Sequence, residues 1–358
     1  MIDFLVIGGG IAGISAAARL SKLGKTVVLE GETALGYHAS GRSAAMFEEN
    51  YGAPTTIALN AASRAFHEDK ELLSPRGIML VGTSTEAEAF EADKKSLKLT
   101  DIAVSEAQDM IPILRADNID RAAYHADAWD IDTDRLLQSF RQMGQENGAQ
   151  ILTGREVTQI RRASHGWQVT TAAETYDAKN IVNAAGAWVD QIADMASIPP
   201  LGFTPLRRSM ARIAAPGGHD PRNWPMLFGP GEDWYAKPDA GALIVSPAEE
   251  DPTTPHDAYA DDMTIAEGFA RYQPYVTEPV TRPLSTWAGL RTFAPDRNLV
   301  LGPDVNDSSF IWCAGQGGYG MQSAPGASQA LADIIGGGTY ALPIETMAQL
   351  SPARFADR

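Results

Sequence analysis

Cysteine is almost missing from the sequence, since Cys313 is the only one among 358 residues. One cysteine excludes an internal disulfide framework and a zinc site built from cysteines, and it fits a reducing compartment. Basic residues are also outnumbered, because 29 Lys and Arg oppose 45 Asp and Glu and give a formal net charge of −16. No local basic patch offsets this charge, so we expect no binding to nucleic acid or to an anionic membrane surface.

Long apolar runs are absent as well, because no segment approaches the roughly 18 apolar residues that a membrane-spanning helix needs. The stretch 1–20 comes nearest and resembles a signal peptide, but it lacks a positively charged start and is interrupted by glycines. We therefore expect this stretch to belong to the fold, and the protein to be soluble, cytoplasmic and without a membrane span. The chain is long enough for two domains of ordinary size.

The first thirty residues predict a strand, a helix and a second strand. Residues 3–7 form a short apolar run that ends at glycine. Residues 11–23 carry apolar side chains at near-helical spacing, and Gly24 stands where a C-cap glycine is expected. Residues 26–30 form a second apolar, β-branched run, which completes the unit.

A G-x-G-x-x-G motif lies within this unit, at Gly8, Gly10 and Gly13. The first glycine permits a tight turn, the second lets the backbone approach a pyrophosphate, and the third lets the helix pack against the strand. Glu30 follows at the end of the second strand, where a carboxylate accepts hydrogen bonds from an adenosine ribose. These features predict a dinucleotide site and leave FAD and NAD open. The small polar loop from Gly36 to Ser43 favours FAD.

The remaining sequence predicts alternating strands and helices, and its composition changes in the middle of the chain. We expect helices over 55–66, 86–98 and 321–335, the last one stopped by Gly336, and a helix from Asp132 through Gln145 that Asp132 caps. Capping is the commoner role of such acidic residues, so we assign no metal. Short strands are expected at 151–152, 156–161, 166–171 and 181–183. Residues 200–287 are proline-rich without a long helical period, which indicates a separate substrate domain.

Ten ordered motifs run along nearly the whole chain. They are V-I-G-G-G-I-A-G at 6–13, G-Y-H-A-S-G-R-S-A-A at 36–45, L-L-S-P-R at 72–76, D-I-D-T-D at 130–134, N-A-A-G-A-W at 183–188, R-R-S at 207–209, W-P-M-L at 224–227, Y-A-K-P-D-A-G at 235–241, T-W-A-G-L-R at 286–291 and Q-G-G-Y-G at 316–320. Together they resemble the D-amino acid oxidase superfamily of FAD enzymes and, within it, the D-arginine dehydrogenases.

The resemblance implies an α/β fold with two domains. A Rossmann-type FAD-binding domain of the glutathione-reductase-like kind would comprise 1–75, 138–200 and 291–358, and a mixed-sheet α+β substrate domain 76–137 and 201–290. It also implies noncovalent FAD, because Cys313 lies in an apolar strand typical of ordinary burial. The cofactor-binding residues would be Gly8, Gly10, Ile11, Ala12, Gly13, Glu30, Gly41, Arg42, Ser43, Ala44, Val157, Ala185, Gly186, Trp188, Gly317, Gly318, Tyr319, Gly320 and Met321.

By the same resemblance, five residues would form the catalytic site. Arg208 and Arg291 would bind the substrate carboxylate, the hydroxyls of Tyr51 and Tyr235 would assist them, and the Gly318 carbonyl would bind the amine. Two guanidinium groups hold a carboxylate in bidentate fashion, which points the Cα–H bond at the flavin for hydride transfer. No side chain is evident as the base that removes an ammonium proton, and water is the alternative.

The expected substrate pocket departs from the relative's pattern. The relative has a histidine at the position of Met46 and an acidic residue that grips a cationic side chain at the position of Ile78. With Met226 and a bulkier Phe228, the pocket is expected to be apolar and tight, favouring D-amino acids with apolar or medium side chains over D-arginine. Glu48, beside Glu49 in the same lid loop, could restore a negative charge. We interpret these two glutamates as a solvated loop.

The resemblance thus implies FAD-dependent oxidative deamination of a D-amino acid to the imino acid, with an electron acceptor that the sequence does not identify. A second hypothesis is oxidation of glycine, an N-alkyl amino acid or a 2-hydroxy acid, all of which use the same carboxylate clamp. A third hypothesis is a flavin-binding subunit without catalysis. The arginine and tyrosine set disfavours this last reading.

Overall fold

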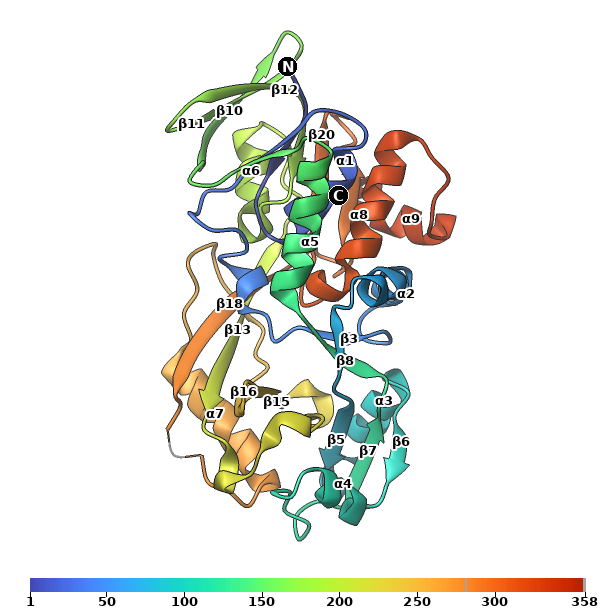
Figure 1. The fold of residues 1–358 in the computed structure, drawn as a ribbon, viewed down its shortest axis with the longest axis vertical. Helices are drawn as coiled ribbons and strands as arrows, with labels where there is room; N and C mark the ends of the chain where they lie inside the picture. The colour runs from blue at the N-terminus through green and yellow to red at the C-terminus, as the bar shows by residue number, and fades with distance from the viewer. Residues whose placement is uncertain (281, 357–358) are drawn as a thin grey trace.

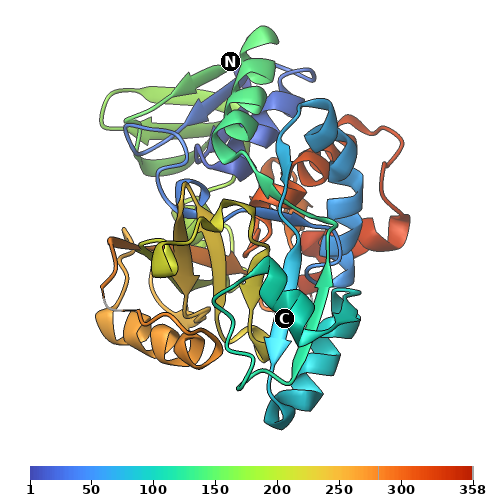
Figure 2. The same ribbon diagram turned by 60° about the horizontal axis from the view of Figure 1, so that its bottom comes forward.

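The chain forms two lobes, each built on its own β-sheet, and passes between them several times (Figure 1). The structure is a computed structural model that describes residues 1–280 and 282–356. Figure 2, turned toward the lower lobe, shows the segments near residues 80–130 and 205–290 lying side by side there. No helix in the described ranges is long and apolar enough to cross a membrane.

The first sheet has eight strands and a parallel centre in which β1 lies between β2 and β12. β9 extends the sheet beyond β2, while β11 and β20 both pair with β12. The strands are β1 Ile2–Ile7, β2 Thr26–Leu29, β9 Gln150–Leu152, β10 Val157–Ala163, β11 Gly166–Thr171, β12 Thr175–Asn183, β19 Val300–Pro303 and β20 Phe310–Ala314.

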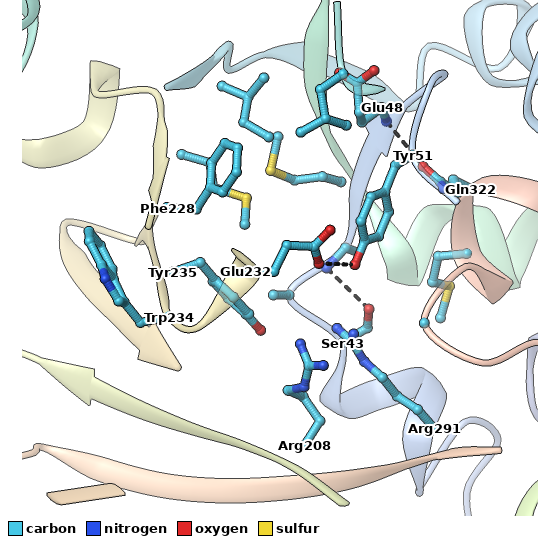
Figure 3. A pocket seen from close by; sticks show the side chains of 18 residues that line it. Ser43, Glu48, Tyr51, Arg208, Phe228, Glu232, Trp234, Tyr235, Arg291 and Gln322 are labelled. Carbon is cyan, nitrogen blue, oxygen red and sulfur yellow. Dashed lines mark hydrogen bonds between the residues drawn. The ribbon is translucent and has the colours of Figure 1, made fainter. Parts of the chain in front are cut away.

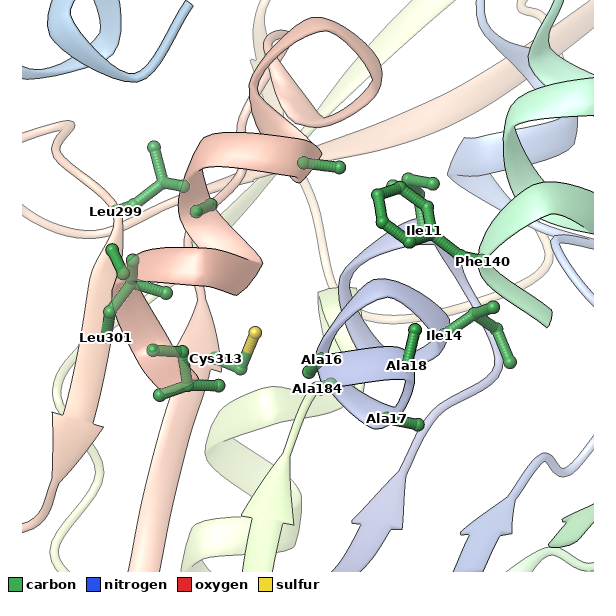
Figure 4. Packing of buried hydrophobic residues seen from close by; sticks show 14 of the residues in the cluster. Ile11, Ile14, Ala16, Ala17, Ala18, Phe140, Ala184, Leu299, Leu301 and Cys313 are labelled. Atoms are coloured by element: carbon green, nitrogen blue, oxygen red, sulfur yellow. The ribbon is translucent and has the colours of Figure 1, made fainter. Parts of the chain in front are cut away.

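Helices cover both faces of this sheet. Phe4 and Val6 of β1 face one apolar cluster, which includes α1 Ile11–Leu20, α5 Thr133–Glu146 and α8 Gly320–Gly336 (Figure 4). Leu5 and Ile7 face the opposite cluster, which includes α6 Val189–Met195. Because β1 is buried on both faces, its sequence is an almost unbroken apolar run rather than an alternating one.

The second sheet is mixed, as expected for the substrate domain. Its strand order is β17-β13-β16-β15-β14-β5-β7-β6, and β18 pairs with β13. β5 and β14 are parallel, and the other pairs are antiparallel. The strands are β5 Ile78–Gly82, β6 Thr100–Ile102, β7 Arg121–His125, β13 Thr204–Ile213, β14 Met226–Phe228, β15 Tyr235–Asp239, β16 Ala242–Ser246, β17 Asp251–Pro252 and β18 Ser285–Phe293.

A small third sheet carries the chain between the lobes. It consists of β3 Met46–Glu48, β8 Ala128–Ile131 and β4 Leu73–Pro75, with β8 in the centre. The remaining helices are α2 Pro54–Asp69, α3 Ala87–Ser96, α4 Val104–Met110, α7 Asp262–Tyr272 and α9 Ile344–Leu350. The segments of the two large sheets follow the predicted interleaved division closely, so we propose those domain boundaries, with β18 crossing the last of them.

Most expected elements are confirmed, including the Asp132 cap, whose carboxylate accepts a hydrogen bond from Arg135 N at 2.9 Å. Three expectations are wrong. α1 ends at Leu20 instead of residue 23, so Gly24 is not its cap. α8 includes Gly336 and is capped by Gly337 in the left-handed conformation. Helix α7 lies in the stretch expected to lack one: its buried residues Ile265, Gly268 and Tyr272 have helical spacing, but the helix is only 11 residues long within a proline-rich stretch.

Candidate active site

Three adjoining cavities run from the first sheet to the second. The first cavity, of about 470 Å³, lies over the β1–α1 turn and Glu30. The second lies beside the N-termini of α1 and α8 and shares Gly10, Ser40 and Arg42 with the first. The third, of about 100 Å³, shares Arg208, Arg291 and Gly318 with the second. This line of cavities suits an elongated cofactor whose reactive end meets a small substrate.

The β1–α1 turn fits the dinucleotide part of FAD. A Cβ at Gly13 would lie 1.9 Å from the Gly8 carbonyl oxygen, so only glycine allows this packing of helix against turn. The N-cap residue of α1 is Gly10, which has no side chain, and Gly10, Ile11 and Ala12 at this N-terminus line the second cavity. The Ser40 hydroxyl accepts a hydrogen bond from Ile11 N at 3.0 Å. A helix N-terminus with its positive dipole end beside a cavity suits a pyrophosphate. The Glu30 carboxylate lines the first cavity and accepts a hydrogen bond from Gly9 N at 2.6 Å.

Most of the predicted cofactor residues line one of these cavities. Three do not: Gly13 packs the helix, Gly41 N donates to the Gly36 carbonyl at 2.7 Å, and the Tyr319 ring packs against Tyr51. Residues that line the first or second cavity but were not among the predicted cofactor-binding residues include Ala39, Ser40, Gly289, Leu290, Thr292 and Gln316. Gly289 and Leu290 stand inside the T-W-A-G-L-R motif, which points to them only after the fold is known.

Arg42 lines the first two cavities, but its guanidinium already forms hydrogen bonds with other residues of the protein. Nη1 donates to the carbonyls of Ala258 and Ala288 at 2.8 and 3.0 Å, and Nη2 pairs with the Asp257 carboxylate. The Trp287 indole donates to the Arg42 carbonyl at 3.2 Å. We name these contacts between the N-terminal loop and the segments 257–258 and 287–288 the Arg42 bridge. The bridge spans the two lobes beside the cofactor cleft.

The five predicted catalytic residues all line the third cavity (Figure 3). Arg208 on β13 stands opposite Gly289 of β18, and Arg291 stands opposite Leu206, so the two arginines are diagonal neighbours on one sheet face. Figure 3 shows both guanidinium groups at the same end of the cavity. The antiparallel register therefore brings together two cations that are 83 residues apart, the difference between 291 and 208.

The two arginines differ in how much of their hydrogen-bonding capacity the protein uses. Arg208 is buried, and it donates to the Glu249 carbonyl at 2.8 Å and contacts the Glu250 carboxylate at 3.4 Å. Burial and the charge of Arg291 lower the pKa of Arg208. The guanidinium of Arg291 has neither a hydrogen bond nor an ion pair with any residue in the described ranges. A half-buried guanidinium without a protein partner is ready to bind an anion.

The two tyrosines occupy different environments. The Tyr235 hydroxyl is buried and has no hydrogen-bond partner among the described residues, so it is free to donate to a ligand. The Tyr51 hydroxyl donates to Glu232 Oε2 at 2.8 Å. Burial and the nearby Glu232 carboxylate raise the pKa of Tyr51 far above its usual range, so the phenol stays protonated. At Gly318 a Cβ would lie 2.9 Å from Arg291 Nη1, so a larger residue there would have to displace that guanidinium.

The opposite end of the third cavity has apolar walls and one buried carboxylate. Met46, Ile78, Met226 and Phe228 line it. The interpretation of Glu48 as a solvated residue is wrong, because it lies in strand β3 and is 3% exposed. One of its oxygens accepts hydrogen bonds from Asn50, and the other lies 2.9 Å from Nε2 of His125. Glu49 is half-buried and pairs with Arg64 instead.

Five residues that line the third cavity were not predicted from the sequence: Ala45, Leu97, Glu232, Trp234 and Gln322. Glu232 and Gln322 are the two that bring a carboxylate or an amide to it. Glu232 follows a Pro-Gly pair typical of a surface turn, and Gln322 stands inside the apolar helix α8. Gln322 accepts a hydrogen bond from Glu48 N at 3.0 Å, and its buried amide nitrogen has no partner in the described ranges. Glu232 has no signal in the sequence, because a glutamate in a polar turn ordinarily faces solvent.

Comparison with known proteins identifies a family and several similar chains. A family model described as FAD dependent oxidoreductase, DAO, matches residues 3–334. The glycerol 3-phosphate dehydrogenase of Caloramator mitchellensis is 27% identical over 99% of this chain and 78% of its own length. The glycine oxidase of Pseudomonas aeruginosa is 25% identical over 93% of this chain and 94% of its own.

Among solved structures, the L-proline dehydrogenase from P. horikoshii superimposes with a TM-score of 0.84 at 20% identity, covering 99% of this chain and 98% of that one. This likeness supports the expected α/β fold with FAD-binding and substrate domains. FAD is the cofactor, and the reaction is FAD-dependent oxidation of an amino acid or a related substrate. The match over residues 3–334 shows that the chain belongs to the DAO family of FAD-dependent oxidoreductases.

Proposed function

We propose that the protein is a FAD-dependent D-amino acid dehydrogenase. It oxidises the substrate to the imino acid, which water then converts to a 2-oxo acid and ammonia. The observation that carries the proposal is the unpartnered guanidinium of Arg291 beside Arg208, at the junction of the second and third cavities. Two cations at this junction hold a carboxylate next to the place where the flavin ends.

The protein's own contribution to the reaction is mainly positioning. Arg291, Arg208 and the free hydroxyl of Tyr235 hold the carboxylate and thereby fix the direction of the Cα–H bond. The carbonyl of Gly318 is an acceptor for the amine. The bound FAD supplies the two-electron acceptor for the hydride. We also propose that FAD is held without a covalent bond, because Cys313 is buried and lines none of the three cavities.

The apolar walls support a preference for medium-sized side chains with an apolar body. Met46, Ile78 and Phe228 exclude water from that part of the cavity and offer no counter-charge along it. The D configuration rests on the resemblance to D-arginine dehydrogenase. D-arginine itself is disfavoured, since its guanidinium would have to pass these walls before it reached the Glu48 carboxylate.

The proposal is tested by anaerobic titration of the FAD-loaded protein, followed through the absorbance of the oxidised flavin. The panel contains D- and L-leucine, D-methionine, D-arginine, glycine, sarcosine and D-2-hydroxy acids. Bleaching chiefly by apolar or medium D-amino acids supports the proposal. Bleaching by hydroxy acids or sarcosine alone would move the assignment to those substrates, and no bleaching at all would favour a non-catalytic subunit.

A further inference from the structure

Glu232 occupies an unusual position for a charged residue at a surface turn. It ends the short 3₁₀ turn Pro230–Glu232 between β14 and β15, and its φ of 55° is in the left-handed region. The preceding Gly231 has a φ of 73°, and its amide donates to the Asp93 carboxylate of α3 at 2.7 Å. A non-glycine residue held with positive φ is uncommon and often marks a functional site.

The turn aims the Glu232 side chain into the third cavity. Although the residue is exposed at the cavity mouth, its carboxyl group reaches the Tyr51 hydroxyl at 2.8 Å. In Figure 3 the Glu232 side chain lies between Tyr51 and Tyr235, on the side of the cavity where both guanidinium groups are. The arginine end of the substrate site therefore contains a carboxylate, Glu232, in addition to its two cations.

The Tyr51–Glu232 hydrogen bond divides the site into two halves. Because the Tyr51 proton points at Glu232, that phenol does not donate to the substrate carboxylate. Tyr235, whose hydroxyl has no partner among the described residues, takes that role with the arginines. What Tyr51 and Glu232 offer instead is oxygen lone pairs. These oxygen atoms, together with the negative charge of the carboxylate, suit an ammonium group, which has only hydrogen-bond donors.

We propose that Glu232 binds the α-ammonium group of the substrate and accepts one of its protons. The inference rests on the proposed oxidation of an amino acid. In this step an N–H bond of the ammonium breaks, an O–H bond forms on Glu232, and the nitrogen keeps the electron pair. When the hydride leaves Cα with its two electrons for the flavin, this pair forms the C=N bond of the imino acid. A 2-hydroxy acid carries no cation, so Glu232 makes the site selective for amines.

The surroundings of Glu232 are consistent with a proton acceptor. Burial raises its pKa, as does the Asp93 charge, while the hydrogen bond from Tyr51 and the charges of Arg208 and Arg291 oppose the rise. The charge of Glu232 also contributes to the raised pKa of the neighbouring Tyr319. A carboxylate with a raised pKa is a better base for an ammonium near neutral pH.

The test compares Glu232→Gln with Asp233→Asn in the FAD-loaded protein. Asp233 is exposed, adjacent in sequence and absent from the cavity wall, so its variant is a matched control. D-leucine and D-2-hydroxyisocaproate are matched substrates that differ in the amine. For Glu232→Gln at neutral pH we expect kcat/KM for D-leucine to fall by about a hundredfold, a typical loss for a general base. Slow reduction by the hydroxy acid should be unchanged or faster, and Asp233→Asn should behave like the parent.

Two further readouts separate a base from a structural residue. In Glu232→Gln the D-leucine rate should recover with rising pH by about tenfold per pH unit, because only free amine reacts when no base is present. Binding of 4-methylpentanoate, which has the carboxylate but no amine, should stay within about twofold, since its partners are the arginines. Loss of 4-methylpentanoate binding, or a D-leucine loss that no pH restores, would overturn the proposal. Failure of all D-amino acids to bleach the parent protein would instead refute the proposed function.

Discussion

Replacement of Arg291 by methionine tests the carboxylate site most directly. Methionine keeps much of the length and apolar contact of the arginine side chain, but it has none of the hydrogen-bond donors of the guanidinium. Hydrogen bonds to charged groups contribute about 1.5–3 kcal/mol each, so loss of a bidentate pair costs about 3–6 kcal/mol of transition-state stabilisation. A factor of ten corresponds to about 1.4 kcal/mol, and kcat/KM should therefore fall by two orders of magnitude or more.

The same variant should not lose stability. The guanidinium of Arg291 forms no ion pair or hydrogen bond within residues 1–280 and 282–356, and its charge repels that of Arg208 and attracts the Glu232 carboxylate. The melting temperature should thus change little. The assay is D-leucine-dependent reduction of an artificial acceptor, with Arg212→Met as the control, because Arg212 lies on the neighbouring strand β13 but pairs with Asp239 outside the cavities. Near-normal turnover in Arg291→Met would mean that another group binds the carboxylate.

Three other substitutions and one labelling experiment test separate parts of the structure. Ile78→Glu should raise the activity on D-arginine relative to D-leucine, and an unchanged ratio would show that Glu48 already supplies the charge or that position 78 does not meet the side chain. Tyr235→Phe should lower kcat/KM by about ten- to a hundredfold without destabilising the protein, because its buried hydroxyl lacks a partner in the described ranges. Gly13→Ala should abolish retention of FAD, as judged by bound flavin after gel filtration, since its Cβ would overlap the Gly8 carbonyl. Burial raises the pKa of Cys313 to about 12, so iodoacetamide should label this thiol only after unfolding, and rapid labelling of the native protein would contradict that environment.

The sequence predicts those parts of the site whose local backbone geometry follows from the spacing of neighbouring residues. The Gly8–Gly13 motif demands one local turn, and that turn is present. The arginines could be chosen only through resemblance, because their convergence depends on the register between β13 and β18. Neither local spacing nor propensity determines which strands pair over such a separation.

Glu48 and Glu232 show what the sequence leaves undetermined. Both stand among polar neighbours that favour a solvated interpretation. Glu48 is buried because β3 pairs with β8, which brings His125 toward it from the end of β7. Glu232 faces the cavity because its backbone is left-handed and its turn is fixed by Asp93 of a distant helix. Long-range contacts, rather than local pattern, decide the direction of these side chains.

The Arg42 bridge has a consequence for the lifetime of the holoprotein. It lies beside the cleft that fits the dinucleotide, so we expect FAD to leave more readily once these hydrogen bonds and the Asp257 ion pair have opened. The residence time of the cofactor is then governed by a local opening event as well as by its affinity. Because Asp257 is largely exposed, salt screens its attraction to Arg42 and speeds that opening. Cofactor exchange should therefore be slow in dilute buffer and faster at high ionic strength.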